Sequence, residues 1–219
     1  MDSIDFIYND DGHLNLPVIP CTDETPNKLS NDLINNDTYF SIFNMNIRSC
    51  RQNFASLISF LNSYLLSFSL LVLCETWLTE ESDYGFNIPG YKQLNIYRNN
   101  FGGGIKIYYK DIFEVEVVED LTFLNNILEI ITFYISGRNF KYLISAIYRP
   151  PSTNENDFNN FLLENILHLN FKTIIIGDIN LNLFNPRKLN FIDNFVNILY
   201  SFSFFQLLRD QLNIIMVIL

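Results

Sequence analysis

The chain has 219 residues, of which 48% are hydrophobic and 16% aromatic. This apolar content excludes an intrinsically disordered protein, and the length predicts one domain with a single core. The formal net charge of −10 argues against a broad basic surface for nucleic acid, although a few well-placed arginines can still contact DNA.

Most of the negative charge lies near the N-terminus. Residues 1–38 contain eight Asp and Glu residues and one basic residue, Lys28, whereas 39–219 contains 13 basic and 16 acidic residues. Three prolines and many Asp and Asn residues leave no sustained periodicity in the first segment. We therefore expect a disordered acidic leader over 1–38, followed by the domain over 39–219.

The cysteine pattern and the N-terminus predict an intracellular protein, nuclear or cytoplasmic. Cys21, Cys50 and Cys74 are odd in number and show no CxxC spacing, so neither a disulfide scaffold nor a zinc site is expected. An acidic N-terminus does not suit a signal peptide. The apolar stretch 57–74 is long enough to raise the question of a membrane span, but Asn62 and four serines interrupt it, so we expect no span.

The first half of the domain predicts strands with one helix among them. Residues 39–46 alternate as a strand, and Ser49 can cap a helix that carries Phe54, Leu57, Ile58 and Leu61 on one face. The wholly apolar run from Leu70 to Cys74 predicts a strand buried on both faces. Further strands are then predicted over 92–98, 103–109, 113–119, 127–135 and 141–148.

The second half of the domain predicts helices around one more buried strand. Residues 155–169 and about 190–203 show helical periodicity, and 172–180 reads as an apolar strand with a polar tip. Since strands dominate the middle of the chain and helices flank them, we expect sheets packed on each other and covered by helices.

Four short motifs stand where predicted strands end: Asn46-Ile-Arg-Ser, Glu75-Thr-Trp-Leu, Ile147-Tyr-Arg-Pro-Pro and Gly177-Asp-Ile-Asn. A polar group at the end of a buried strand can be held firmly by the scaffold. Each motif alone has an ordinary explanation as well. Glu75 could be the first solvated residue after its strand, and Asp178-x-Asn180 could be a turn.

The order of these motifs resembles that of the endonuclease/exonuclease/phosphatase superfamily, and most closely its non-LTR retrotransposon branch. A fifth motif, Gly102-Gly103-Gly104 before a strand, also has its counterpart there. The resemblance covers about 40–209. It implies a DNase I-like fold, which is a four-layer α/β sandwich of two mixed sheets flanked by helices.

The resemblance implies Mg²⁺-dependent hydrolysis of phosphodiester bonds in DNA. Glu75 would be the metal ligand with Asn46 beside it, in keeping with the oxygen ligands that Mg²⁺ prefers. Asp178 would align and deprotonate the attacking water. Asn180 would orient either the phosphate or Asp178.

Three further residues are implied at the phosphate. Tyr148 would donate a hydrogen bond to it. Arg149 and Arg48 would make either phosphate contacts or structural contacts.

The resemblance also implies a later catalytic Asp and a final Ser-Asp-His motif, and neither has a counterpart after Asp178. On this ground 39–219 is a partial domain whose last strands are missing, and nicking of DNA is expected at or near background. Three alternatives follow: a nuclease domain with a truncated end, a non-catalytic relic of such a domain, or a phosphatase for small phosphoesters with the same fold.

Overall fold

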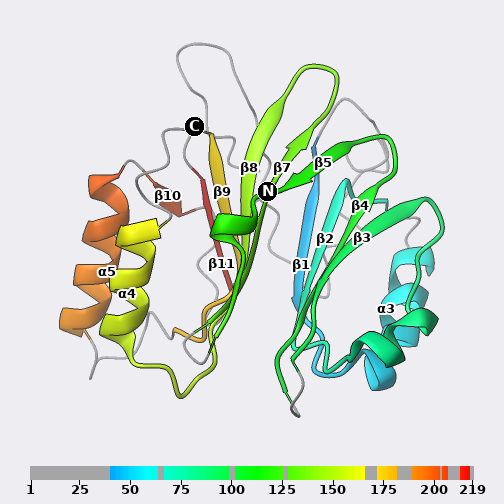
Figure 1. Cartoon of the computed structure of the whole chain (residues 1–219), viewed down its shortest axis with the longest axis horizontal. Helices are drawn as coiled ribbons and strands as arrows, with labels where there is room; N and C mark the ends of the chain where they lie inside the picture. The colour runs from blue at the N-terminus through cyan, green and yellow to red at the C-terminus, as the bar shows by residue number, and fades with distance from the viewer. Residues whose placement is uncertain are drawn as a thin grey trace, which may run out of the picture.

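The chain folds as a sandwich of four layers: two helices, a large sheet, a small sheet and a third helix (Figure 1). The structure is a computed structural model, and it describes residues 40–63, 67–98, 102–125, 128–165, 172–181, 189–202, 204–206 and 213–217. The acidic leader predicted over 1–38 lies outside these described residues. The predicted fold class, an α/β sandwich of two mixed sheets flanked by helices, is confirmed.

The small sheet has the strand order β1-β2-β4-β3. Its strands are β1 (Ile42–Asn46), β2 (Leu70–Cys74), β3 (Tyr91–Ile96) and β4 (Ile105–Lys110). β1 and β2 are parallel, so their carboxyl ends lie at the same edge, whereas β4 runs antiparallel to both of its neighbours. All five residues of β2 are buried, as its apolar sequence predicts.

The large sheet has the order β10-β11-β9-β8-β7-β5, and the short β6 also pairs with β7. Only β8 and β9 are parallel among its described pairs. Their carboxyl ends therefore also lie at one edge. The strands are β5 (Glu114–Val117), β6 (Phe123–Leu124), β7 (Glu129–Ser136), β8 (Lys141–Tyr148), β9 (Thr173–Asp178), β10 (Phe205–Gln206) and β11 (Asn213–Val217).

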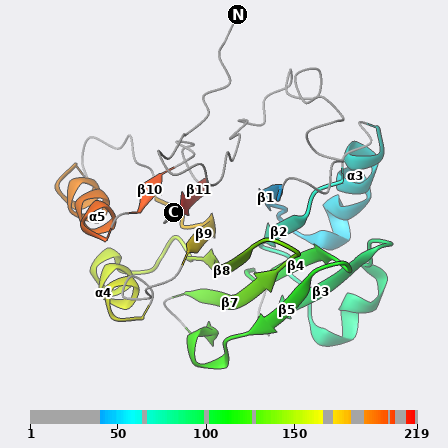
Figure 2. The same ribbon diagram turned by 90° about the horizontal axis from the view of Figure 1, so that it is seen from above.

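The helices cover the outer faces of the two sheets, as Figure 2 shows from above. Helix α3 (Cys50–Ser63) lies on the small sheet, and helices α4 (Glu155–Asn165) and α5 (Leu189–Ser201) lie on the large one. On α3 the buried Leu57 and Leu61 are four residues apart, which places them on one face of the helix. On α3, the apolar face that the periodicity predicts is therefore the face that packs on the small sheet.

The main core lies between the two sheets. Alternate residues of β2 divide between the two sides: Leu70 and Val72 face the large sheet, whereas Leu71 and Leu73 join the cluster under α3. This alternation follows from the two-residue period of a strand. A strand with apolar residues on both faces is therefore required here, because the small sheet is covered on both sides.

The structure contains elements that the sequence analysis did not assign. A 3-10 helix, η1 (Glu80–Gly85), lies between β2 and β3, and a second one, η2 (Glu119–Leu121), follows β5. After α5 the sheet continues with β10 and β11, and β11 pairs antiparallel with β9. The apolar run at 214–219 contains no alternation that marks a half-buried strand, which is why β11 was not predicted.

The apolar stretch 57–74 divides between two elements. Its first part belongs to α3 and its last part is β2. No helix in the described part of the chain is long and apolar enough to cross a membrane. Cys50 and Cys74 are buried free thiols, and Cys21 lies outside the described residues.

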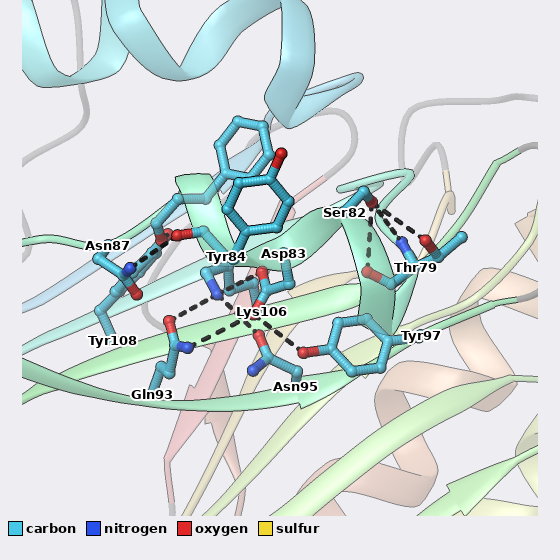
Figure 3. Close-up of polar contacts among 11 residues, drawn as sticks. Thr79, Ser82, Asp83, Tyr84, Asn87, Gln93, Asn95, Tyr97, Lys106 and Tyr108 are labelled. Atoms are coloured by element: carbon cyan, nitrogen blue, oxygen red, sulfur yellow. Dashed lines mark hydrogen bonds and ion pairs between the residues drawn. The ribbon is translucent and has the colours of Figure 1, made fainter.

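A buried ion pair fixes η1 to the outer face of the small sheet (Figure 3). Lys106 of β4 is 1% exposed, and its Nζ donates to Asp83 Oδ1 at 2.7 Å. The same Nζ donates to the side-chain oxygens of Gln93 and Asn95, and the Tyr97 hydroxyl donates to Asp83 Oδ2. Burial lowers the pKa of Lys106, and Asp83 opposes this effect. The network thus supplies the partners that a buried charge needs.

Replacing Asp83 with alanine should lower the free energy of unfolding by about 3 kcal/mol, because it leaves the Lys106 ammonium buried without its counter-charge. Denaturant unfolding measures the effect. Glu81→Ala, an exposed acid in the same turn, is the matched control and should change stability by no more than about 0.5 kcal/mol. Equal stability of the two variants would show that the ion pair does not hold η1.

Candidate functional site

Four strand ends come together where the two sheets approach each other. In the small sheet Asn46 is the register partner of Cys74, and in the large sheet Tyr148 is the partner of Asp178. The sheets are linked here, since Cys74 Sγ lies 3.8 Å from the carbonyl oxygen of Ile147. The four motifs predicted from the sequence therefore meet at one edge of the sandwich.

The side chain of Asn46 joins a carboxylate of each sheet. Its Nδ2 donates to Glu75 Oε1 at 2.8 Å and to Asp178 Oδ2 at 2.7 Å. Both oxygens bond to the same nitrogen, so they lie no further apart than the sum of these two distances. Asn46 Oδ1 in turn accepts from the backbone N–H of Arg48 at 3.1 Å, which fixes the orientation of the amide.

Asp178 is the most buried carboxylate of this group, at 1% exposure. Its Oδ1 accepts the backbone N–H of Asn180 at 3.0 Å. Burial raises the pKa of Asp178, and the hydrogen bonds from Asn46 and Asn180 oppose that rise. Asp178 is thus an oriented carboxylate whose affinity for a proton is higher than that of an exposed aspartate.

Tyr148 is buried at the end of β8, and its hydroxyl donates to Glu75 Oε1 at 3.3 Å. Burial raises its pKa, and the negative charges of Glu75 and Asp178 raise it further. The hydroxyl therefore keeps its proton at neutral pH and can serve as a hydrogen-bond donor.

The backbone is strained around these residues. The described non-glycine residues with positive φ are Arg48, Ser49, Glu75, Trp77 and Asn180, and all five belong to these motifs. Such conformations are uncommon for residues with a Cβ and persist only where the surroundings enforce them. Each turn redirects a side chain at the point where its strand leaves the core.

The guanidinium group of Arg149 bonds to the backbone just beyond the end of β9. It is buried at 3% exposure, and its Nη atoms donate to the backbone carbonyls of Ile179, Asn180 and Thr153. These contacts are structural, and the phosphate contact of Arg149 stays a prediction. A buried arginine can satisfy several carbonyls of irregular backbone at once.

Arg48 and Asn180 differ in exposure and in the groups that they face. Arg48 is exposed, and its charge lowers the pKa of Asp178, so it lies near that carboxylate. Asn180 directs its side-chain Nδ2 to the carbonyl of Arg149 at 2.8 Å. In this arrangement Asn180 orients Asp178 through its backbone N–H. The exposed side chain of Arg48 can contact an anion at the site.

Glu129, a fully buried carboxylate behind the site, has no role predicted from the sequence. Glu129 begins β7, and its Oε2 accepts the backbone N–H of Gly104 at 2.6 Å. Its Oε1 forms an ion pair with Arg98 at 3.3 Å. Burial raises the pKa of Glu129, and the Gly104 and Arg98 contacts oppose the rise. The signal in the sequence was a single acidic residue at the start of an otherwise apolar strand, where a buried charge needs a partner.

The site has the donors that a hard divalent cation requires. Glu75 and Asp178 supply two carboxylates held close together, and Mg²⁺ commonly uses one or two carboxylates and keeps several waters. Among the described residues, no group of three or more His, Cys, Asp or Glu side chains is placed to hold a metal. The two carboxylates therefore fit a divalent cation that completes its coordination with water.

Comparisons with solved structures support the fold. The endonuclease domain of TRAS1, a telomere-specific non-LTR retrotransposon, aligns with a TM-score of 0.61 at 13% identity over 81% of this chain and 83% of that one. An AP endonuclease from Archaeoglobus fulgidus aligns with a TM-score of 0.57 at 14% identity, covering 81% and 86% of the two chains. A mannosyl-6-phosphatase from Bacteroides thetaiotaomicron gives 0.59 at 12% identity, over 82% and 85%.

The chain thus has the DNase I-like fold of these enzymes, as its motifs predicted. The similar structures named here are nucleases and a phosphatase. No family model matches the sequence. No curated protein matches it either.

Gly177 should be irreplaceable at the end of β9. Its φ is +140°, and a Cβ there would meet the backbone of Ile147 on the neighbouring strand. Gly177→Ala should therefore lower the free energy of unfolding by at least about 2 kcal/mol, from strain and overpacking together. Gly85→Ala is the control, since nothing lies within 4 Å of the added Cβ. Equal unfolding midpoints for the two variants would contradict the close strand approach.

Relative to wild type, Asp178→Asn should gain stability as pH rises in the absence of divalent cations. The change removes one of two adjacent negative charges, although the amide can accept only one of the two N–H donors that face Asp178. Because the folded pKa of Asp178 is raised, protonation favours the folded wild type, and each unit of raised pKa corresponds to about 1.4 kcal/mol of pH-dependent difference between the two proteins. Thermal unfolding in chelator across pH measures it. A stability difference that stays constant with pH would contradict the charge argument.

Proposed function

We propose that this site binds Mg²⁺ and hydrolyses phosphodiester bonds in DNA, as the endonuclease of a non-LTR retrotransposon. The observation that carries the proposal is the Asn46 amide held between Glu75 of one sheet and Asp178 of the other. Two carboxylates brought this close repel each other without a cation, so their arrangement favours one. The fold and the order of the motifs support the same function.

Glu75 would hold the metal with Asn46 beside it, and Asp178 would stand next to the metal as the base. When bound, Mg²⁺ would neutralise negative charge on the phosphate and lower the pKa of a bound water. The buried position of Asp178 and its two hydrogen-bond donors keep that carboxylate fixed during the reaction. Preorganisation of this kind is what an active site gains from rigid strand ends.

Three residues of the chain have the remaining roles in the reaction. Asp178 would accept the proton of the attacking water as the water oxygen bonds to phosphorus and the bond to the leaving oxygen breaks, and the leaving oxygen would take a proton from solvent water. Tyr148 keeps its proton and donates a hydrogen bond to a phosphate oxygen. Arg48, exposed beside Asp178, contacts a flanking phosphate of the strand.

A nicking assay with supercoiled plasmid tests the proposal. The rate expected from the sequence is low, so protein is used in excess over DNA and each variant is compared with wild type. Nicking should require Mg²⁺ and should fall by at least about 10²-fold in Asp178→Asn, the loss typical of a positioned base. Asp111→Asn, an exposed aspartate in the turn after β4, should leave the rate unchanged.

Metal binding is measured separately. Mg²⁺ at ten times its dissociation constant should stabilise wild type by about 1.4 kcal/mol, and Glu75→Gln should abolish this gain. Metal binding without any Mg²⁺-dependent nicking would overturn the nuclease assignment and favour a non-catalytic protein. Hydrolysis of a small phosphomonoester in place of plasmid would instead favour a phosphatase.

A further inference from the structure

We propose that Trp77 is a stacking platform for a nucleobase of the DNA strand bound at the site, next to the phosphate that Arg48 contacts. The inference rests on the proposed function and deepens it, since it names the part of the substrate that a second contact recognises. Trp77 lies two places after Glu75, in the motif Glu75-Thr-Trp-Leu.

Trp77 is the only tryptophan of the chain, and its side chain is 39% exposed. The residues on either side of it, Thr76 and Leu78, are both 1% exposed. A single large aromatic ring thus projects from a segment that is otherwise buried. Within the described part of the chain, no ring contact joins it to another aromatic side chain. Exposed aromatic rings of this kind are where bases stack in single-strand binding sites.

The backbone holds this ring in an unfavourable conformation. Trp77 has φ of +54°, which is uncommon for a residue with a large side chain. Its N–H donates to the carbonyl of Gly103 at 3.0 Å, and the N–H of Thr76 donates to Gly104 at 3.2 Å. Strain in such a conformation persists only where surrounding structure enforces it, and it is concentrated at functional sites.

Both ends of the segment are fixed. On one side Gly104 is bound by the buried Glu129. On the other side η1 is held to the sheet by Asp83 and Lys106 and begins with a capping box between Thr79 and Ser82 (Figure 3). A ring held on a rigid segment loses little conformational entropy on binding, which favours its use as a contact.

The place of the ring fits a strand that crosses the site. The backbone N–H groups of Ser49 and Cys50 donate to the carbonyls of Glu75 and Thr76, so the turn that carries Arg48 lies against the segment that carries Trp77. A phosphate-binding cation and a stacking ring therefore flank Glu75 from adjacent turns. Together they match the alternation of phosphate and base along a nucleic-acid strand.

The fluorescence of Trp77 gives a direct test, because no other tryptophan contributes to it. Wild type is titrated with a short single-stranded DNA oligonucleotide in Ca²⁺, and with an oligonucleotide of the same length made of abasic sites. We expect the normal strand to change the tryptophan emission and to bind about tenfold more tightly than the abasic strand, as loss of one stacked base predicts.

The variants separate stacking from folding. Trp77→Ala should weaken binding of the normal strand about tenfold and of the abasic strand less than twofold, whereas Trp77→Phe should keep most of the affinity. Trp77→Gly also removes the ring, but glycine tolerates the positive φ. It should reproduce the alanine result, which separates loss of the ring from any disturbance of the turn by alanine. Tyr84→Ala removes an aromatic side chain that is 84% exposed on η1, and should change neither affinity.

Two outcomes overturn the proposal in distinguishable ways. If wild type binds the normal and abasic strands equally and Trp77→Ala leaves both affinities unchanged, the stacking role is wrong while DNA binding stands. If wild type binds neither strand in Ca²⁺, the stacking role is wrong as well, and the proposed function is wrong if Mg²⁺-dependent plasmid nicking is also absent.

Discussion

The structure depends on one contact, the amide of Asn46 shared by the carboxylates of Glu75 and Asp178. These three groups come from two sheets, and burial of Asp178 raises the cost of its charge unless donors face it. One nitrogen that donates to both oxygens thus joins the two sheets at this edge.

Close packing around the site constrains two glycines. Gly177 lies where a Cβ would meet the neighbouring strand of its own sheet, and Gly104 leaves room for Thr76 while its N–H bonds to Glu129 of the other sheet. The strained turns at Glu75 and Asn180 each direct a polar group out of a buried strand.

The sequence predicted those elements whose signal is local. The apolar run of β2, the helical stripes of α3 and α5 and the polar groups at strand ends all follow from periodicity and burial. The order of the motifs then predicted the sandwich. The role of Arg149 was not decided by sequence, because its partners are carbonyls of the turn at Ile179 and Asn180, far along the chain. Glu129 was missed for the same reason, since its contacts are non-local.

The supporting contacts explain why the motif around Glu75 extends beyond the carboxylate. Thr76 and Leu78 are buried and fix the segment, and the bonds to Gly103 and Gly104 hold its turn in the left-handed region. A metal ligand alone would need only Glu75 to be placed. The strained and exposed Trp77 between two buried neighbours has no part in that task. Its exposed ring is therefore placed for the proposed contact outside the protein, and a base beside the phosphate is the ligand whose chemistry fits a flat, exposed ring.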